Sequence, residues 1–211
     1  MWTGCARSKW SEQGRTSPFC GDNPAPSKTR AAPVRLLLSM SSFQVRPATL
    51  RDVQAIAQVH AAASQAAYQD LVPAEALNAT PMEKRQAFWR DAVEYGEPQV
   101  YVAQADGRVV GFVGFDRSRD PKSKPTVGEI WAIYLDQAHW SQGGGVELWD
   151  AAREELIEEG CTSVTVWVPL RNERAIRFFE LAGFKREMNT AKTAVVGGVK
   201  LEEVRLKRAL N

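Results

Sequence analysis

Three consecutive glycines, Gly143 to Gly145, stand between an expected strand and an expected helix. Glycines at such a point let the backbone approach a ligand closely, and the unpaired N–H groups of a helix's first turn attract anions. A pyrophosphate group is the anion that such a turn suits best. A flexible entry into the helix that binds no ligand explains the same three glycines about equally well.

Two familiar phosphate-binding motifs do not fit this turn. A Walker A loop requires a Lys followed by Ser or Thr after its last glycine, and neither follows here. A dinucleotide-binding fingerprint requires a small third residue where this chain has Leu148, and an acidic residue at the end of the following strand, which is absent. Both of these nucleotide-binding folds are therefore excluded.

Glu129 is the carboxylate best suited to accept a proton. It lies in the stretch Val127–Leu135, and the alternation of a strand predicts that it shares a face with Val127, Trp131, Ile133 and Leu135, opposite to Tyr134. A carboxylate on an otherwise apolar face is desolvated, which favours a general base that works near neutral pH. The alternative is a glutamate at a strand end that is solvated or paired with an arginine.

The surrounding pattern predicts the elements that position these residues. Apolar periodicity, capping residues and turn residues give the order β-α-α-β-β-β-α-β-α-β-β, which is a single α+β domain without internal repeats. The expected strands are Phe43–Arg46, Val100–Ala105, Val109–Phe115, Val127–Leu135, Val164–Val168 and two around Gly197-Gly198. The expected helices follow Thr49, occupy Pro73–Ala92 with an interruption at residues 78–81, and span Gly143–Glu159 and Asn172–Ala182.

The composition excludes several classes of protein. The 211 residues are 44% hydrophobic and 25% charged, as in soluble globular proteins, and no apolar run approaches the ~20 residues needed to cross a bilayer. Three cysteines and two histidines are too few for a disulfide scaffold or a recognisable zinc site, so no metal is expected. The net charge of +2 gives little support to nucleic-acid binding.

The basic excess belongs to residues 1–39. They contain six Lys and Arg residues against two acidic residues, together with four prolines, and they show no helical or strand periodicity. We expect a disordered or dispensable extension, either resembling a transit peptide or arising from a mis-set start, with Met40 as the candidate true start. The remaining domain, residues 40–211, then carries a net charge of −2.

Two spaced motifs resemble those of the GNAT N-acetyltransferase superfamily. The first is Trp140-Ser-Gln-Gly-Gly-Gly145, which is similar to the family's acyl-CoA motif [RQ]-x-x-G-x-[GA]. The second is Asn172-Glu-Arg-Ala-Ile-Arg-Phe-Phe-Glu-Leu-Ala-Gly-Phe184, which is similar to N-x-x-A-x-x-[FL]-Y-x-x-x-G-F. The resemblance covers nearly all of residues 43–208 and implies a mixed, mostly antiparallel central sheet flanked by helices.

The resemblance also implies a binding mode for acetyl-CoA, between the Val127–Leu135 and Val164–Val168 strands. The backbone of Ile133, Tyr134 and Leu135 would pair with the pantetheine arm, and Asn172, Phe178 and Phe179 would line the thiol end. The pyrophosphate would lie on the turn formed by Trp140, Ser141, Gln142, Gly143, Gly144, Gly145 and Val146. Acetyl-CoA is thus the expected co-substrate.

The implied reaction is direct attack of a primary amine on the thioester through a tetrahedral intermediate. Glu129 would be the base, acting through water as in many relatives, and a backbone N–H near Leu135 would stabilise the oxyanion. Two positions depart from the family pattern. Trp140 replaces the usual Arg or Gln, and Phe179 replaces the Tyr that protonates the thiolate in many relatives, which leaves the acid unassigned. The alternative is a non-catalytic acyl-CoA-binding module that has lost this acid.

The acceptor is expected to be the amine of a small molecule, protein or peptide. Tyr68, Trp89 and Trp131 are the candidate residues for binding it, although Tyr68 and Trp89 could equally bury a mobile helix pair. We expect a cytoplasmic enzyme that binds neither nucleic acid nor membrane. Relatives are often homodimers, but no segment of this sequence marks an interface.

Overall fold

The computed structural model of this chain describes residues 43–187, 189–196 and 198–210. The predicted extension 1–39 and the candidate start Met40 lie outside the described residues. No helix in the described part combines the length and the apolar character that crossing a membrane would require.

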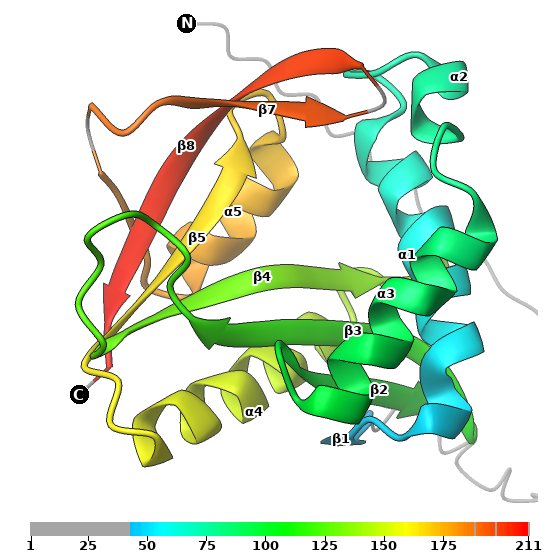
Figure 1. The fold of residues 1–211 in the computed structure, drawn as a ribbon, viewed down its shortest axis with the longest axis horizontal. Coiled ribbons are helices and arrows are strands. Elements are labelled where there is room, and N and C mark those ends of the chain that lie inside the picture. Colours follow the sequence, from blue (N-terminus) through cyan, green and yellow to red (C-terminus); the bar gives the residue numbers. More distant parts are fainter. Residues whose placement is uncertain (1–42, 188, 197, 211) are drawn as a thin grey trace, which may run out of the picture. The chain divides into compact units, whose positions relative to one another are not determined.

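The elements follow the predicted order with small additions (Figure 1). The strands are β1 (Gln44–Pro47), β2 (Gln99–Ala105), β3 (Arg108–Arg117), β4 (Val127–Leu135), β5 (Ser163–Pro169), β6 (Lys185–Arg186), β7 (Lys192–Val196) and β8 (Val199–Ala209). The α-helices are α1 (Val53–Tyr68), α2 (Ala74–Leu77), α3 (Met82–Tyr95), α4 (Gly144–Glu158) and α5 (Glu173–Leu181). Two 3₁₀ turns, η1 (Leu50–Asp52) and η2 (Gln137–His139), precede α1 and α4. The sequence pattern missed β6, since two residues are too few to show a period.

Among the described residues, the strands form one sheet in the order β1-β2-β3-β4-β5-β8-β6, and β7 pairs with β8. All pairs are antiparallel except β4 with β5, which confirms the expected mixed, mostly antiparallel sheet. The β2–β3 hairpin turns at Asp106 and Gly107, which both have positive φ (49° and 74°). Two such residues match the twist of the flanking strands, so the Asp-Gly signal predicted this hairpin correctly.

Helices cover both faces of the strands β2 to β4 (Figure 1). On one face, α1 and α3 contribute buried residues such as Ile56 and Trp89, which pack against Phe112 of β3. On the other face, Leu148 and Trp149 of α4 belong to a second core cluster with β3, β4 and β5. Strands β2 to β4 are therefore covered on both sides, and α1 and α4 lie across this part of the sheet from each other.

The parallel strands β4 and β5 pair over only part of their length. Their register runs from Val127 opposite Ser163 to Ile130 opposite Val166, and no pairing continues beyond these residues although both strands do. In Figure 1 the two strands diverge from this point. The divergence leaves one edge of the second half of β4 without a partner strand, as the family resemblance implied.

His60 stabilises the core between α1 and α3 in its neutral form. Its Nδ1 accepts a hydrogen bond from Nε1 of Trp89 at 3.0 Å. Burial lowers the pKa of His60 to about 4, and the positive charge of Arg85 acts in the same direction. The folded state therefore resists protonation of a side chain whose pKa in an unfolded chain is about 6.5.

A pH dependence of stability follows from this lowered pKa. The stabilisation by neutral His60 is fully present above about pH 6.5 and is lost as the pH falls towards about 4, by roughly 2–3 kcal/mol in total. His60→Asn keeps an acceptor near Trp89 but does not titrate. Urea unfolding at several pH values should show that the wild type loses more stability than His60→Asn in this window. Equal losses in the two proteins would contradict this role of His60.

Candidate functional site

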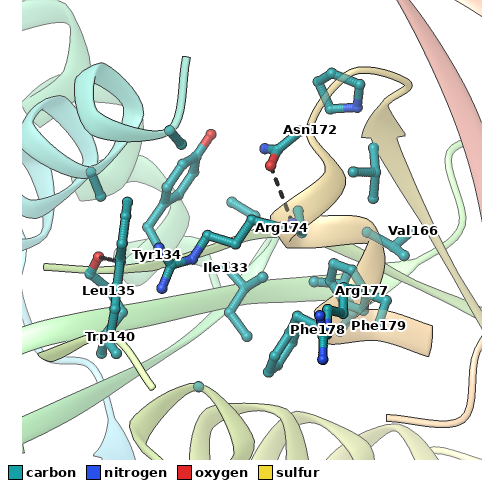
Figure 2. A pocket seen from close by; sticks show the side chains of 18 of the residues that line it. Ile133, Tyr134, Leu135, Trp140, Val166, Asn172, Arg174, Arg177, Phe178 and Phe179 are labelled. Carbon is teal, nitrogen blue, oxygen red and sulfur yellow. Dashed lines mark hydrogen bonds between the residues drawn. The ribbon is translucent and has the colours of Figure 1, made fainter. Parts of the chain in front are cut away.

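The cavity where β4 and β5 diverge has a volume of about 610 Å³ and is the candidate site (Figure 2). Its walls come from the last residues of β4, the loop before α4, the end of β5, the start of α5 and the C-terminal end of α1. Residues that are about 100 positions apart in the sequence thus meet around one space. This arrangement suits an elongated ligand that enters between the two strands.

The glycine turn presents backbone N–H groups at one end of this cavity. Ser141 and Gly143 have positive φ values of 59° and 99°, and α4 begins at Gly144. Within the described part of the chain, the N–H groups of Gly143, Gly144 and Gly145 donate to no backbone carbonyl. Free amides at a helix N-terminus bind anions, so the geometry of this turn fits a phosphate ligand.

Most of the predicted site residues line the cavity. They are Tyr68, Trp131, Ile133, Tyr134, Leu135, Trp140, Ser141, Gly143, Gly145, Val146, Asn172, Phe178 and Phe179. Gln142 and Gly144 belong to the same turn but not to the cavity wall. Gln142 is exposed and donates from Nε2 to the carbonyl of Ala138 at 2.7 Å. Gly144 is buried below Phe43, where a Cβ atom would come within 2.9 Å of the ring.

Asn172 has a structural role that the sequence motif did not specify. Its Oδ1 accepts a hydrogen bond from the backbone N–H of Ala175 at 3.1 Å, so it caps the N-terminus of α5. The cap fixes the first turn of α5 at the cavity (Figure 2). Asn172 therefore helps to position the residues that follow it.

The pairing of β3 with β4 shifts by one residue at Trp131. Phe115 pairs with Ile130 whereas Gly114 pairs with Ala132, so β4 contains one extra residue at Trp131. A bulge of this kind interrupts the strict alternation of side chains along a strand. Residues on the two sides of Trp131 therefore do not follow a single pattern of alternate faces.

This bulge corrects the predicted orientation of Glu129. Ile130, Ile133 and Leu135 all pack with the core cluster on the α4 side of the sheet. Glu129 is the neighbour of Ile130 in the strand and so faces the α1 side, where Tyr134 packs. The predictions that Glu129 shares a face with Ile133 and Leu135, and that it lies opposite Tyr134, are therefore wrong.

The Glu129 carboxylate is buried and paired with an arginine. Only 2% of its side chain is exposed, and it accepts hydrogen bonds from the backbone N–H of Arg119 at 2.8 Å and from the Arg119 guanidinium. The same guanidinium lies 4.0 Å from the centre of the Trp131 ring. The structure thus combines the two alternatives left by the sequence, because the carboxylate is both desolvated and matched by a positive charge.

Tyr68 and Tyr134 approach each other at the α1 side of the cavity. Their hydroxyl oxygens are 3.4 Å apart, and both side chains line the cavity wall. The neighbouring Tyr134 and burial both raise the pKa of Tyr68 well above its usual value, so Tyr68 keeps its proton at neutral pH. Together the pair places two hydroxyl groups at the predicted acceptor side.

Trp89 does not belong to the acceptor site. It is 2% exposed, packs against Phe112 and hydrogen-bonds His60, and it is not among the residues that line the cavity. The prediction that it binds the acceptor is corrected. Its neighbour Phe88 is half exposed, which shows that the aromatic pair simply alternates between the core and the surface of α3.

Trp131 offers a hydrogen-bond donor to a ligand. Its Nε1 is buried and has no partner among the described residues, while its side chain lines the cavity. A buried N–H group without a partner is costly, which a bound acceptor or a water molecule would relieve. This observation supports the predicted acceptor role of Trp131, which stays a prediction.

The sequence reasoning missed three charged residues at or beside the site. Arg174 and Arg177 line the cavity from α5. Glu203 of β8 is not part of the cavity wall but faces the same region as Tyr68, Arg119 and Glu129. Burial raises the pKa of Glu203, although the positive charges of Lys192 and Arg119 oppose this effect. No signal in the sequence indicated Glu203, because β8 reaches the site only through its pairing with β5.

The residues present fit an acyl-CoA molecule. The unpaired edge of β4 offers backbone groups to an amide-containing arm, and the glycine turn offers N–H groups to a diphosphate. The described residues contain no cluster of His, Cys, Asp and Glu that could hold a metal ion. The site therefore provides the two kinds of backbone contact that the family resemblance implied.

Comparisons with known proteins agree with this geometry. The model of the Acetyltransferase (GNAT) family matches residues 64–184. An uncharacterized N-acetyltransferase of Bacillus subtilis, YuaI, is 32% identical over 77% of this chain and 90% of its own. Two solved structures share the fold at low sequence identity, and both were determined with a CoA ligand.

The first is the PaiA N-acetyltransferase from Thermoplasma acidophilum in complex with coenzyme A. It has a TM-score of 0.66 and 16% identity over 80% of this chain and 99% of its own. The second is the putative acetyltransferase YncA from Salmonella typhimurium with acetyl-CoA, with a TM-score of 0.62 and 21% identity over 80% and 94% of the two chains. This chain therefore belongs to the GNAT family and is an acyltransferase of the N-acetyltransferase type.

Proposed function

We propose that this chain transfers the acetyl group of acetyl-CoA to a primary amine of a small molecule or peptide. The observation that carries this proposal is the cavity between the diverging strands β4 and β5, which has the glycine turn at one end and the Tyr68–Tyr134 pair at the α1 side. Amine nitrogen attacks the thioester carbon, a C–N bond forms, and the C–S bond breaks after a tetrahedral intermediate. The backbone N–H near Leu135 stays the predicted oxyanion donor.

Glu129 is the proposed base and acts through a water molecule. It does not line the cavity, whereas its neighbours Ile130 and Trp131 do, so a direct contact with the amine is replaced by a relay. Arg119 fixes the carboxylate in place through its backbone N–H and its guanidinium. Glu203 adds a second negative charge on this side, which favours binding of a cationic ammonium group before its deprotonation.

Tyr134 is the proposed donor of the proton that the thiolate takes up. Phe179 has no hydroxyl, and the hydroxyl-bearing residues among the described cavity residues are Tyr68, Tyr134 and Ser141. Tyr134 lies on β4, the strand along which the acyl donor is expected to bind, and the Tyr68 hydroxyl oxygen is 3.4 Å from its own. Tyr68 is therefore placed to support Tyr134 by a hydrogen bond.

Tyr134→Phe should lower turnover with acetyl-CoA by roughly tenfold. This loss is smaller than the one expected on removing an essential general acid, because a thiolate leaves without much help from a proton. The decisive comparison is an acetyl ester of an aromatic thiol, whose thiolate needs no proton to leave. The variant should transfer the acetyl group from this donor at nearly the wild-type rate. An equal loss with both donors would show that Tyr134 only shapes the cavity.

A second candidate function is an acyl-CoA-binding module without activity, which Phe179 favours. A screen of small amines and peptide N-termini with acetyl-CoA distinguishes the two functions by release of free thiol. Turnover with at least one class of amine supports the enzyme, whereas tight CoA binding without turnover on any amine supports the module. The cytoplasmic location and the homodimer stay predictions.

A further inference from the structure

The side chain of Trp140 is anchored at the end of β4 and carries an arginine on its face. Its indole Nε1 donates to the carbonyl of Leu135 at 2.7 Å, and the Arg174 guanidinium carbon lies 3.5 Å from the centre of its ring. Trp140 comes from the loop after β4, whereas Arg174 comes from α5, which follows β5. The contact therefore bridges the two sides of the cavity (Figure 2).

Arg174 lines the cavity with an exposed side chain whose charge has no acidic partner among the described residues. It is the second residue of α5, so its charge lies near the positive end of the helix dipole. Burial lowers the pKa of Arg174, and no carboxylate among the described residues forms an ion pair with it. A charge that is partly desolvated and close to a like dipole is stabilised when an anion binds beside it.

The amides of the glycine turn lie at the same end of the cavity as this arginine. Trp140 immediately precedes the turn, and Ser141, Gly143, Gly145 and Arg174 all line the cavity. A guanidinium stacked on an aromatic ring keeps the N–H groups at its edge available, and these groups match two phosphate oxygens. The turn and Arg174 can thus act on one diphosphate from two sides.

We propose that Arg174, oriented by the ring of Trp140, binds the diphosphate of acyl-CoA and replaces the cation or amide that GNAT relatives carry at position 140. The inference rests on the proposed function, since it requires that CoA be the ligand. It explains how a motif that has lost its usual Arg or Gln retains a positive charge at the turn. In this arrangement, the Trp140 ring stacks against the Arg174 guanidinium and holds it beside the turn.

Calorimetric titration of CoA and of dephospho-CoA into the full chain tests this proposal without any acceptor. Arg174→Ala should weaken binding of both ligands on the order of tenfold to a hundredfold, since both contain the diphosphate. Arg171→Ala is the matched control, because it removes the same charge three residues earlier from a side chain that does not line the cavity, and it should change neither affinity. The double variant Trp140→Arg with Arg174→Ala restores the motif cation and should recover most of the lost affinity.

Thermal melting without ligand checks that Arg174→Ala is folded. Unchanged CoA affinity in Arg174→Ala would overturn the proposal, and so would a loss confined to CoA, which would assign Arg174 to the 3′-phosphate that dephospho-CoA lacks. Absence of CoA binding by the wild type would instead overturn the proposed function. The two failures are therefore distinguishable in one series of titrations.

Discussion

Replacing Glu129 by Gln lowers the turnover of acetyl transfer by about 100-fold or more, within the range of general base catalysis. Gln has nearly the same shape as Glu and can still accept the hydrogen bond from the Arg119 backbone, but it cannot take a proton from the attacking amine. Arg119 is half exposed, so its guanidinium can move into solvent once the carboxylate is gone. The loss should appear in kcat with little change in the affinity for CoA.

Glu203→Gln is the matched comparison for this variant. It removes a carboxylate on the same side of the sheet, close to the same arginine. If Glu203 only attracts the ammonium group, its loss raises the KM for the amine and leaves kcat within a few-fold of the wild type. A larger fall of kcat in Glu203→Gln than in Glu129→Gln would assign the base to Glu203 and contradict the role given to Glu129.

Truncating Trp89 to Ala should cost about 3–5 kcal/mol of unfolding free energy, the range for a large aromatic side chain removed from a core. Trp89 is 2% exposed, contacts the Phe112 ring at 4.7 Å between centroids, and satisfies His60 through its Nε1. For a domain of this size, the melting temperature should fall by roughly 10 °C or more. Urea unfolding measures the free energy directly.

Trp89→Phe is the control for the core role of Trp89. It keeps an aromatic ring against Phe112 but loses the hydrogen bond to His60, so it should cost clearly less than Trp89→Ala. In both variants, the KM for the amine should stay near the wild-type value in the folded fraction. A large change of this KM without loss of stability would show that Trp89 does contribute to acceptor binding.

The sequence predicted the elements that have a strong local signal. The Asp106-Gly107 turn and the glycine turn before α4 depend on backbone conformations that few residue types adopt. These features were therefore readable without tertiary information. The location of the site could be predicted as well, because the elements that carry the two motifs are the ones that border the cavity.

The sequence failed where geometry depends on neighbours in space. One extra residue at Trp131 reversed the face of Glu129, and a bulge leaves no signature in the alternation of residue types. Arg119 reaches Glu129 from a loop, and Arg174 reaches Trp140 across the cavity, so neither partner follows from periodicity. Trp89 was misplaced because an aromatic residue on a helix suits a core and a pocket equally well.

The most direct test of the central claim is mass spectrometry of amines after incubation with acetyl-CoA that carries an isotope-labelled acetyl group. The account predicts that the wild type places the label on the nitrogen of at least one class of primary amine, and that Glu129→Gln does so far more slowly while binding CoA equally well. If both proteins bind CoA and the wild type forms labelled amine no faster than Glu129→Gln, this account is contradicted.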